Sequence, residues 1–164
     1  MKGRAVKAER MKIGGVLVSQ KIGMISIEGT PNTPGIAGMV LESLGTAGIS
    51  VEFISCCPDL GGGATISVCV EMTYFDEALD RVEEIRAEVD AKKVVTNEDL
   101  CALAVFGPHF REIPNVASQV FKALAEVGIN ILAISTSVSS VTCVFKQESL
   151  AEALASLRSR FEIP

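Results

Sequence analysis

Residues 30–55 read TPNTPGIAGMVLESLGTAGISVEFIS, and residues 110–135 read FREIPNVASQVFKALAEVGINILAIS. When the first stretch is shifted by 80 positions onto the second, both have a Pro before a helical pattern, a Leu inside it, a Gly-Ile pair after it and an Ile-Ser pair further on. Similarity at a fixed spacing indicates a duplicated structural unit. The chain of 164 residues therefore contains two copies of one plan.

The similarity continues beyond Ser55, but with a shift of 75. The shift changes because the first copy has an extra turn at residues 58–63, which ends in three consecutive glycines. The pairs that then match are Ile66 with Val141, Val68 with Cys143, Val70 with Phe145, and Leu79 with Leu154. The two copies thus match along most of their length.

Hydrophobic periodicity predicts the elements of each copy, because period two indicates a strand and apolar residues three and four apart indicate a helix. The predicted order is strand, helix, strand, strand, helix, strand. In the first copy we expect strands at residues 24–27, 49–57, 65–72 and 92–96, and helices at 35–47 and 75–89. The composition, rich in Val, Ile, Leu and Ala and without Trp, suits helices packed on a sheet.

The second copy begins near Leu100, and the sequence stops at Pro164 before a last strand could form. A strand at residues 13–18, followed by a Gln20-Lys21 turn, precedes the first copy and has no place in it. We therefore expect this strand to cross over and complete the second copy. The predicted division is a basic tail at 1–12, a first repeat at 19–98 and a second repeat at 99–164, completed by 13–18.

The net charge of −5 and the pI near 5.0 predict no nucleic-acid partner, since phosphates require a basic surface. Five Lys or Arg residues occur within residues 1–12, but no apolar run of signal-peptide or membrane-spanning length follows. We expect a cytoplasmic protein with no membrane contact.

Five cysteines show no CxxC spacing, and His109 is the only histidine, so the sequence predicts no metal site and no cofactor. The cysteines are interpreted as small buried thiols in a reducing compartment. Cys56 and Cys57 are adjacent at the end of a predicted strand, and a thiol-based redox sensor remains an alternative hypothesis there.

No catalytic residue is predicted. The three glycines at 61–63 match no phosphate-binding motif and are interpreted as a hairpin. The serines and threonine at 135–140 lack a histidine in a recognisable triad order.

The motifs identified so far resemble a known family. The stretch from Gly29 to Ala37, together with residues 47–51, is similar to the first loop and second strand of ACT domains. Residues 124–131, followed by Ile134 and the Ser-Thr-Ser at 135–137, resemble the second ACT repeat of aspartokinases. The resemblance covers about residues 13–164 and includes no kinase half. It implies an α+β fold of two ferredoxin-like βαββαβ repeats, with antiparallel sheets and helices on one face.

The resemblance also implies a regulatory module that binds a free amino acid and controls an enzyme of amino-acid metabolism. The first loop suits a carboxylate, because Pro34 and Gly35 precede a helix whose first N–H groups are free. The ligand-binding residues predicted from the loop and the resemblance are Asn32, Thr33, Pro34, Gly35, Ile36, Ala37, Ser50, Val51, Glu52, Thr65, Asn130, Ile131 and Ser135.

Two further questions stay open at this point. Glu52 could anchor an amino group, or it could lie on the outer sheet face or at a subunit contact. Exposed strand edges and the apolar Ile54, Leu132 and Ile134 favour a homodimer, and a separate aspartokinase subunit is the natural enzyme partner. The alternative function is a structural dimerisation module without ligand, since Asn32, Thr65, Asn115 and Val138 depart from the family pattern.

Overall fold

The computed structural model describes residues 10–108, 110, 112 and 114–164, so His109 lies outside the described residues. The elements in chain order are β1 (Met11–Lys12), β2 (Gly15–Pro31), α1 (Ile36–Thr46), β3 (Val51–Pro58), β4 (Gly63–Glu71), the short 3₁₀ helix η1 (Met72–Tyr74), α2 (Phe75–Glu88), β5 (Lys93–Phe106), α3 (Val116–Glu126), β6 (Ala133–Thr136), β7 (Ser140–Lys146), η2 (Gln147–Ser149), α4 (Leu150–Arg160) and β8 (Phe161–Glu162). The predicted helices and antiparallel strands are confirmed.

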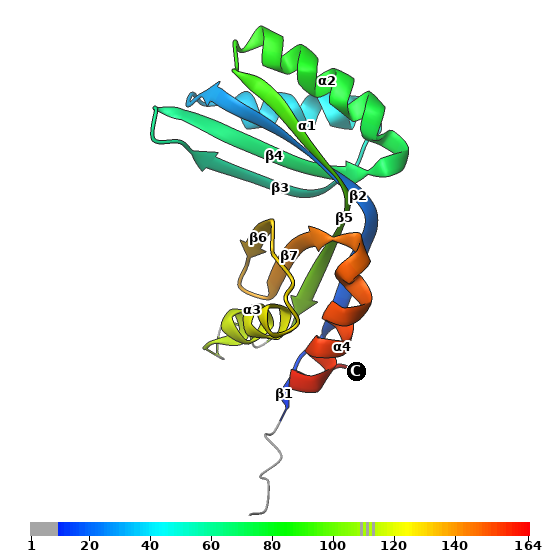
Figure 1. The fold of residues 1–164 in the computed structure, drawn as a ribbon. Helices are drawn as coiled ribbons and strands as arrows, with labels where there is room; N and C mark the ends of the chain where they lie inside the picture. The colour runs from blue at the N-terminus through cyan, green and yellow to red at the C-terminus, as the bar shows by residue number, and fades with distance from the viewer. Residues whose placement is uncertain (1–9, 109, 111, 113) are drawn as a thin grey trace, which may run out of the picture.

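Six strands form one antiparallel sheet in the order β3-β4-β2-β5-β7-β6. Its two long central strands, β2 and β5, run through both halves of the molecule, and the sheet bends where they cross from one half to the other (Figure 1). Helices α1 and α2 lie outside the upper half, and α3 and α4 lie outside the lower half (Figure 1). Helices on one face and short loops between pleated strands are the arrangement of ferredoxin-like repeats.

Residues 15–19 of β2 pair with residues 102–106 of β5, and residues 22–28 pair with residues 93–100. Ile13, Val16 and Val18 pack into the core beneath α3 and α4, whereas Ile25 and Ile27 pack beneath α1 and α2. The first strand segment therefore contributes to the second half of the molecule. The division into repeats at residues 19–98 and 99–164 stays a prediction.

The predicted turn at Gln20-Lys21 and the predicted strand end at Thr96 are wrong, because both strands continue. Each has a bulge at the crossing: the register of β2 shifts between Ser19 and Ile22, and Lys21 has a φ of 54°. Asp99 of β5 has a φ of 56° at the same level. A bulge adds one residue without breaking the ladder, so the apolar residues of both halves face the helices.

Part of the predicted basic tail is paired. Met11 and Lys12 form β1, which pairs in parallel with Phe161 and Glu162 of β8. Of residues 1–12, the structure describes only Arg10, Met11 and Lys12.

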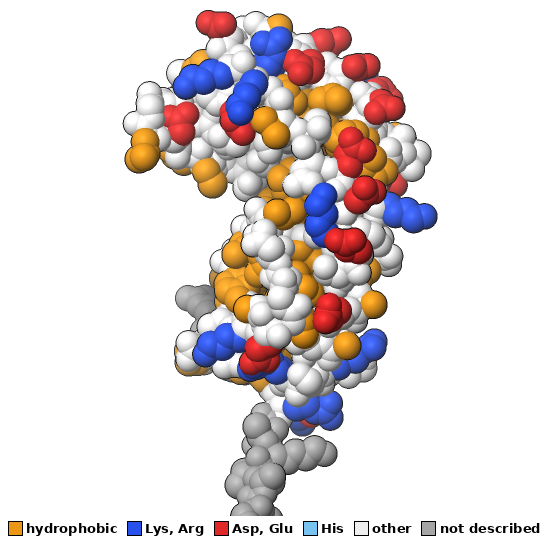
Figure 2. Space-filling view, in the orientation of Figure 1, with side chains coloured by type: hydrophobic (Ala, Val, Ile, Leu, Met, Phe, Trp, Pro, Cys, Tyr) orange, Lys and Arg blue, Asp and Glu red, His pale blue; other side chains and the backbone are white. Residues whose placement is uncertain are grey.

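The face of the sheet opposite the helices is concave, and Figure 2 shows the molecule hollowed between its two halves on that side. A third apolar cluster joins the halves there. Its buried members are Ile22, Met24, Phe53, Cys69, Leu100, Ala102 and Val144. This cluster makes the two halves one packed body.

Candidate functional site

The loop before α1 ends at Gly35, whose φ of 104° and ψ of −23° place it in the left-handed region. Its carbonyl accepts a hydrogen bond from the N–H of Met39 at 2.9 Å, which starts the helix. A Cβ at Gly35 would contact no atom within 4 Å, so space is open beside the first helical turn. The first N–H groups of a helix have no partner within the helix, and the space beside Gly35 at this helix start is open.

The loop before α3 repeats this geometry with Asn115 in place of Gly35. Asn115 has a φ of 72°, and its carbonyl accepts the N–H of Gln119 at 3.0 Å and the Ser118 hydroxyl at 3.0 Å. Asparagine tolerates the left-handed region better than most residues. The departure from glycine that the sequence showed is therefore compatible with the same loop shape.

Strands β3 and β6, which follow α1 and α3, occupy equivalent positions in the two halves, as their pairing shows. Ser55 of β3 pairs with Ser67, and Ser135 of β6 pairs with Thr142. One position further on, Cys56 pairs with Ile66 and Thr136 pairs with Val141. These pairs reproduce the sequence shifts of 80 and 75, and β3 and β6 lie at the two edges of the sheet.

A cavity of about 220 Å³ lies in the second half, between the loop before α3 and the edge strand β6. Its lining combines apolar side chains with two hydroxyls and the first turn of α3. The lining residues are Phe110, Pro114, Asn115, Val116, Ala117, Thr136, Ser137 and Val141. The Ser137 hydroxyl oxygen accepts the N–H groups of Ser139 and Ser140, at 3.2 and 3.0 Å, and so holds the β6–β7 turn that closes the cavity.

The residues predicted to bind the ligand do not all come together. Residues 32–35 form the loop beside Ala64 of β4, and Ile36 and Ala37 begin α1, whereas Val51 pairs with Val70 at the other end of β4. Six residues of an extended strand span about 20 Å. Ser50, Val51 and Glu52 therefore lie far from the loop, and Thr65 lies near the loop but on the concave face, opposite Cys57.

In the second half, Ser135 lies next to Thr136, which lines the cavity. Asn130 and Ile131 precede Leu132, whose N–H is bonded to Val144, nearer the centre of the molecule. None of the residues that line this cavity was among the predicted ligand-binding residues. Only the duplication of the sequence could have indicated these lining residues, because they correspond to residues of the first copy around its loop.

Glu52 accepts a hydrogen bond from the Ser19 hydroxyl at 2.5 Å, so it joins edge strand β3 to the crossing strand β2. It lies near Cys69, and burial together with the charge of Glu52 raises the pKa of that thiol to about 12. This contact within the chain was not among the alternatives considered for Glu52, which stay predictions.

The five cysteines fall into two groups. Cys69, Cys101 and Cys143 are buried, and burial raises the pKa of each thiol, to about 12, 11 and 12. Cys56 and Cys57 are exposed on β3. The interpretation of all five as buried thiols is therefore wrong for these two, because an edge strand has no neighbour to cover it.

Comparison with known proteins gives related sequences and structures. Residues 103–161 match the ACT domain family. The chain is 28% identical over 155 residues to an aspartate kinase from Stutzerimonas stutzeri, covering 94% of this chain and 38% of that protein. The ligand-free regulatory subunit of aspartate kinase from Thermus thermophilus superimposes with a TM-score of 0.81 at 27% identity, covering 92% of this chain and 99% of that one.

This chain contains an ACT-domain match at residues 103–161, and as a whole it is similar to the regulatory region of aspartokinases. A structure of aspartokinase alpha and beta subunits also matches, with a TM-score of 0.80 at 26% identity over 90% of this chain and 97% of the matched chain. The chain spans 38% of the length of the aspartate kinase that it matches. The matched ACT segment lies in the half of the molecule that contains α3, β6, β7 and α4.

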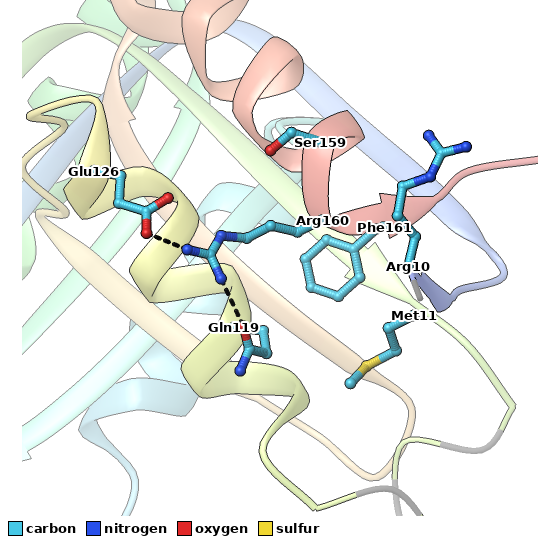
Figure 3. Close-up of a pocket in the computed structure, with 7 residues that line it drawn as sticks. All are labelled: Arg10, Met11, Gln119, Glu126, Ser159, Arg160 and Phe161. Atoms are coloured by element: carbon cyan, nitrogen blue, oxygen red, sulfur yellow. Dashed lines mark hydrogen bonds and ion pairs between the residues drawn. The ribbon is translucent and has the colours of Figure 1, made fainter. Parts of the chain in front are cut away.

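A larger cavity of about 460 Å³ lies away from both loops of the ACT repeats, where α3, α4 and β1 meet (Figure 3). The Arg160 guanidinium fills one side of it, donating to Gln119 at 2.8 Å and pairing with Glu126 (Figure 3). Arg10 donates to the carbonyl of Arg158 at 3.2 Å. Because both guanidinium groups have partners in the chain, we do not assign the effector to this cavity.

Two further observations concern metal ions and membranes. No group of three or more His, Cys, Asp or Glu residues that could hold a metal ion occurs among the described residues. Of the helices in the described part of the chain, none is both long and apolar enough to cross a membrane.

Proposed function

We propose that this chain is a non-catalytic regulatory module, which binds a free amino acid and allosterically controls an enzyme of amino-acid metabolism. The cavity of the second ACT repeat carries the proposal. Three kinds of group meet there: free N–H groups at the start of α3, the apolar Val116 and Val141, and the Thr136 hydroxyl.

The recognition has a simple physical basis. The first-turn N–H groups and the dipole of α3 favour a carboxylate, and the Pro114-Asn115 turn leaves them accessible. A volume of about 220 Å³ corresponds to about seven waters at liquid density, which is the size of a free amino acid. The ammonium group would then bind carbonyl and hydroxyl oxygens of the β6 edge.

The enzyme partner is inferred from the relatives. The structures that match include a regulatory subunit of aspartate kinase and a complex of aspartokinase alpha and beta subunits. We propose a separate aspartokinase subunit as the partner, in the cytoplasm, and a homodimer formed through the unpaired sheet edges. Ile54 and Ile134 are 37% and 47% exposed on these edges, which supports such a contact.

The test is a thermal shift of the reduced protein against each of the twenty amino acids. An effector at one hundred times its Kd stabilises the fold by about 2.7 kcal/mol. For a protein of this size that raises Tm by about 5–10 °C. We expect one or two amino acids to give such a shift.

A matched pair of variants locates the site. Ala117→Glu places a carboxylate in the second-repeat cavity, where the effector carboxylate would bind, and Ala37→Glu does the same beside the first loop. Both substitutions lie in a first helical turn, where an acidic residue is tolerated or stabilising. We expect Ala117→Glu to lose the second-repeat binding while retaining the unliganded Tm.

The alternative is a dimerisation module without a ligand, which the two exposed edges favour. It predicts that no amino acid raises the Tm. It also predicts a dimer in sedimentation experiments. A dimer whose Tm is raised by no amino acid, either alone or in the presence of the kinase subunit, would overturn the regulatory proposal.

A further inference from the structure

The cavity between the loop before α3 and the edge strand β6 has an apolar wall. Val116 and Val141 are 4% and 3% exposed, and Phe110 and Ala117 are half-buried beside them. None of the lining residues that the structure describes carries a charged side chain. A charged ligand side chain placed against this wall would lose its hydration without gaining a counter-ion, which is costly. The wall therefore favours an uncharged, apolar side chain.

The polar groups of the lining are few, and one of them is already engaged. The Ser137 hydroxyl accepts two backbone N–H groups and is hydrogen-bonded to the Ser140 hydroxyl at 2.9 Å. Among the hydrogen bonds of the described residues, none involves the side chain of Thr136 or of Asn115. These two side chains and the first N–H groups of α3 can bind the carboxylate and the ammonium that every free amino acid has. No polar side chain of the described lining then remains for a polar effector side chain.

The polar and apolar parts of the lining are separated in depth. Asn115 and Thr136 are exposed, whereas Val116 and Val141 are buried. A bound amino acid would therefore keep its charged groups at the mouth and place its side chain inward. The volume of about 220 Å³ equals that of about seven waters, which suits a short branched side chain better than an aromatic one.

The first half of the molecule differs in the charge near its loop. The hairpin at residues 58–63, which the second half lacks, pairs Gly63 with Pro31 beside the first loop. Its Asp59 carboxylate accepts the N–H groups of Gly61 and Gly63 at 2.7 and 2.9 Å. A cationic side chain bound at the first loop would have this carboxylate nearby, whereas the described lining of the second cavity offers none. The charge of the effector side chain therefore distinguishes the two halves as binding sites.

We propose that the second-half cavity selects an amino acid with a short, branched aliphatic side chain, such as valine or isoleucine, and excludes lysine. This selectivity rests on the proposed function and names the class of effector at that site. The carboxylate binds at the start of α3, the ammonium binds the Thr136 hydroxyl, and the side chain contacts Val116 and Val141. Threonine has nearly the shape of valine but binds less well, because its hydroxyl would lie against the apolar wall.

The first test measures Kd of the full chain by isothermal titration calorimetry for valine, isoleucine, threonine and lysine. We expect valine or isoleucine to bind most tightly. Threonine should bind about 10–100-fold more weakly, since an apolar pocket rejects an added hydroxyl only moderately. Lysine should bind more than about 100-fold more weakly, because its charge would be unpaired. Lysine or threonine binding as tightly as valine would overturn the proposal.

A matched pair of variants tests the apolar wall itself. Val141→Thr adds a hydroxyl to the wall at nearly constant shape, and Val105→Thr makes the same change at a buried residue that pairs with Val141 and lies outside the lining. The ratio of threonine affinity to valine affinity should rise about tenfold in Val141→Thr and stay within about twofold in Val105→Thr. If Val141→Thr does not fold, Val116→Thr in the first turn of α3 makes the same test. An unchanged ratio in the folded wall variant would contradict the proposal.

The site variants Ala117→Glu and Ala37→Glu separate this selectivity from the proposed function. Valine binding that is lost in Ala117→Glu and kept in Ala37→Glu supports both. Lysine binding with the same dependence overturns the selectivity alone, because the cavity would still bind an amino acid. Valine binding that is lost only in Ala37→Glu also overturns it, since the effector would then occupy the first half. No binding of any amino acid overturns the proposed function and the selectivity together.

Discussion

At the scale of single residues, the backbone conformation of the residue before α1 and of the residue before α3 shapes the candidate site. Gly35 has a φ of 104° and Asn115 a φ of 72°, and both accept the first hydrogen bond of the helix. A side chain at such φ values is strained even where space is available. The open space at Gly35 means that conformation, and not a clash, restricts this position.

Gly35→Ala should therefore destabilise the protein by about 1–2 kcal/mol through backbone strain. Gly38 is the matched control, because it lies in α1 and a Cβ there would also contact nothing within 4 Å. Gly38→Ala should stabilise by about 0.5–1 kcal/mol through helix propensity. Urea unfolding of both variants tests this, and equal effects would contradict it.

The buried thiols make a second prediction at this scale. Burial raises the pKa of Cys69 and Cys143 to about 12, above the ordinary value of 9.0 for a thiol. The unfolded state therefore loses these protons first as the pH rises, and stability falls between about pH 9 and 12, by at most about 1.4 kcal/mol per pH unit for each thiol.

We expect Tm to decline above pH 9 and to decline less steeply in Cys143→Ala, after allowance for the lower Tm of that variant at pH 7. The same pH series on Cys57→Ser serves as control, because Cys57 is exposed. Identical slopes in the wild type and Cys143→Ala would refute the assignment.

At the scale of elements, the crossing of β2 and β5 determines how the repeats join. Gln147 accepts the N–H of Lys21 at 2.8 Å and donates to Gln20 at 3.1 Å. Lys146 donates to the Asn97 side chain at 2.8 Å and to the Glu98 carbonyl at 2.9 Å. Two adjacent residues of the second repeat thus hold the bulges of both central strands.

Lys21 has a φ of 54°, which a glycine adopts without strain. Lys21→Gly should relieve the left-handed strain, and the greater entropy of the unfolded chain should offset part of this gain. We therefore expect a net stabilisation of about 0.5–1 kcal/mol. The adjacent Gln20→Gly removes a hydrogen bond without relieving strain and should destabilise. Denaturant unfolding measures both, and a destabilised Lys21→Gly would show that the Lys side chain contributes more than its strain.

At the scale of the whole molecule, the N-terminal strand segment belongs to the core of the distant repeat. Ile13 is buried among α3, α4 and β7 residues, and Val16 and Val18 pack against the same cluster. The apolar cluster on the concave face joins the repeats as well. The repeats should therefore depend on each other for folding.

Deleting residues 1–20 should unfold the second repeat, because it removes β1, the part of β2 that pairs with residues 102–106, and the core side chains Ile13, Val16 and Val18. Deletion of residues 1–9 keeps every described strand and is the control. Amide hydrogen exchange by mass spectrometry should show loss of protection in α3 and α4 for the longer deletion only. Unchanged melting of the longer deletion would refute the interdependence.

Local patterns in the sequence were sufficient for the helices, the loops before them, the duplication and the ACT resemblance. These features depend on periodicity and turn residues within about fifteen positions, so residues such as Gly35 and Gly48 indicate them directly. The left-handed conformation of Asn115 was not predicted from the sequence and is seen only in the structure.

Tertiary pairing alone decided the rest. The continuity of β2 and β5 through Lys21 and Asp99 depends on partners that lie far away in the chain. The same holds for the contact of Glu52 with Ser19 and for the position of Thr136 at the cavity. Strand register and sheet edges arise from nonlocal hydrogen bonds, which no short window of sequence contains.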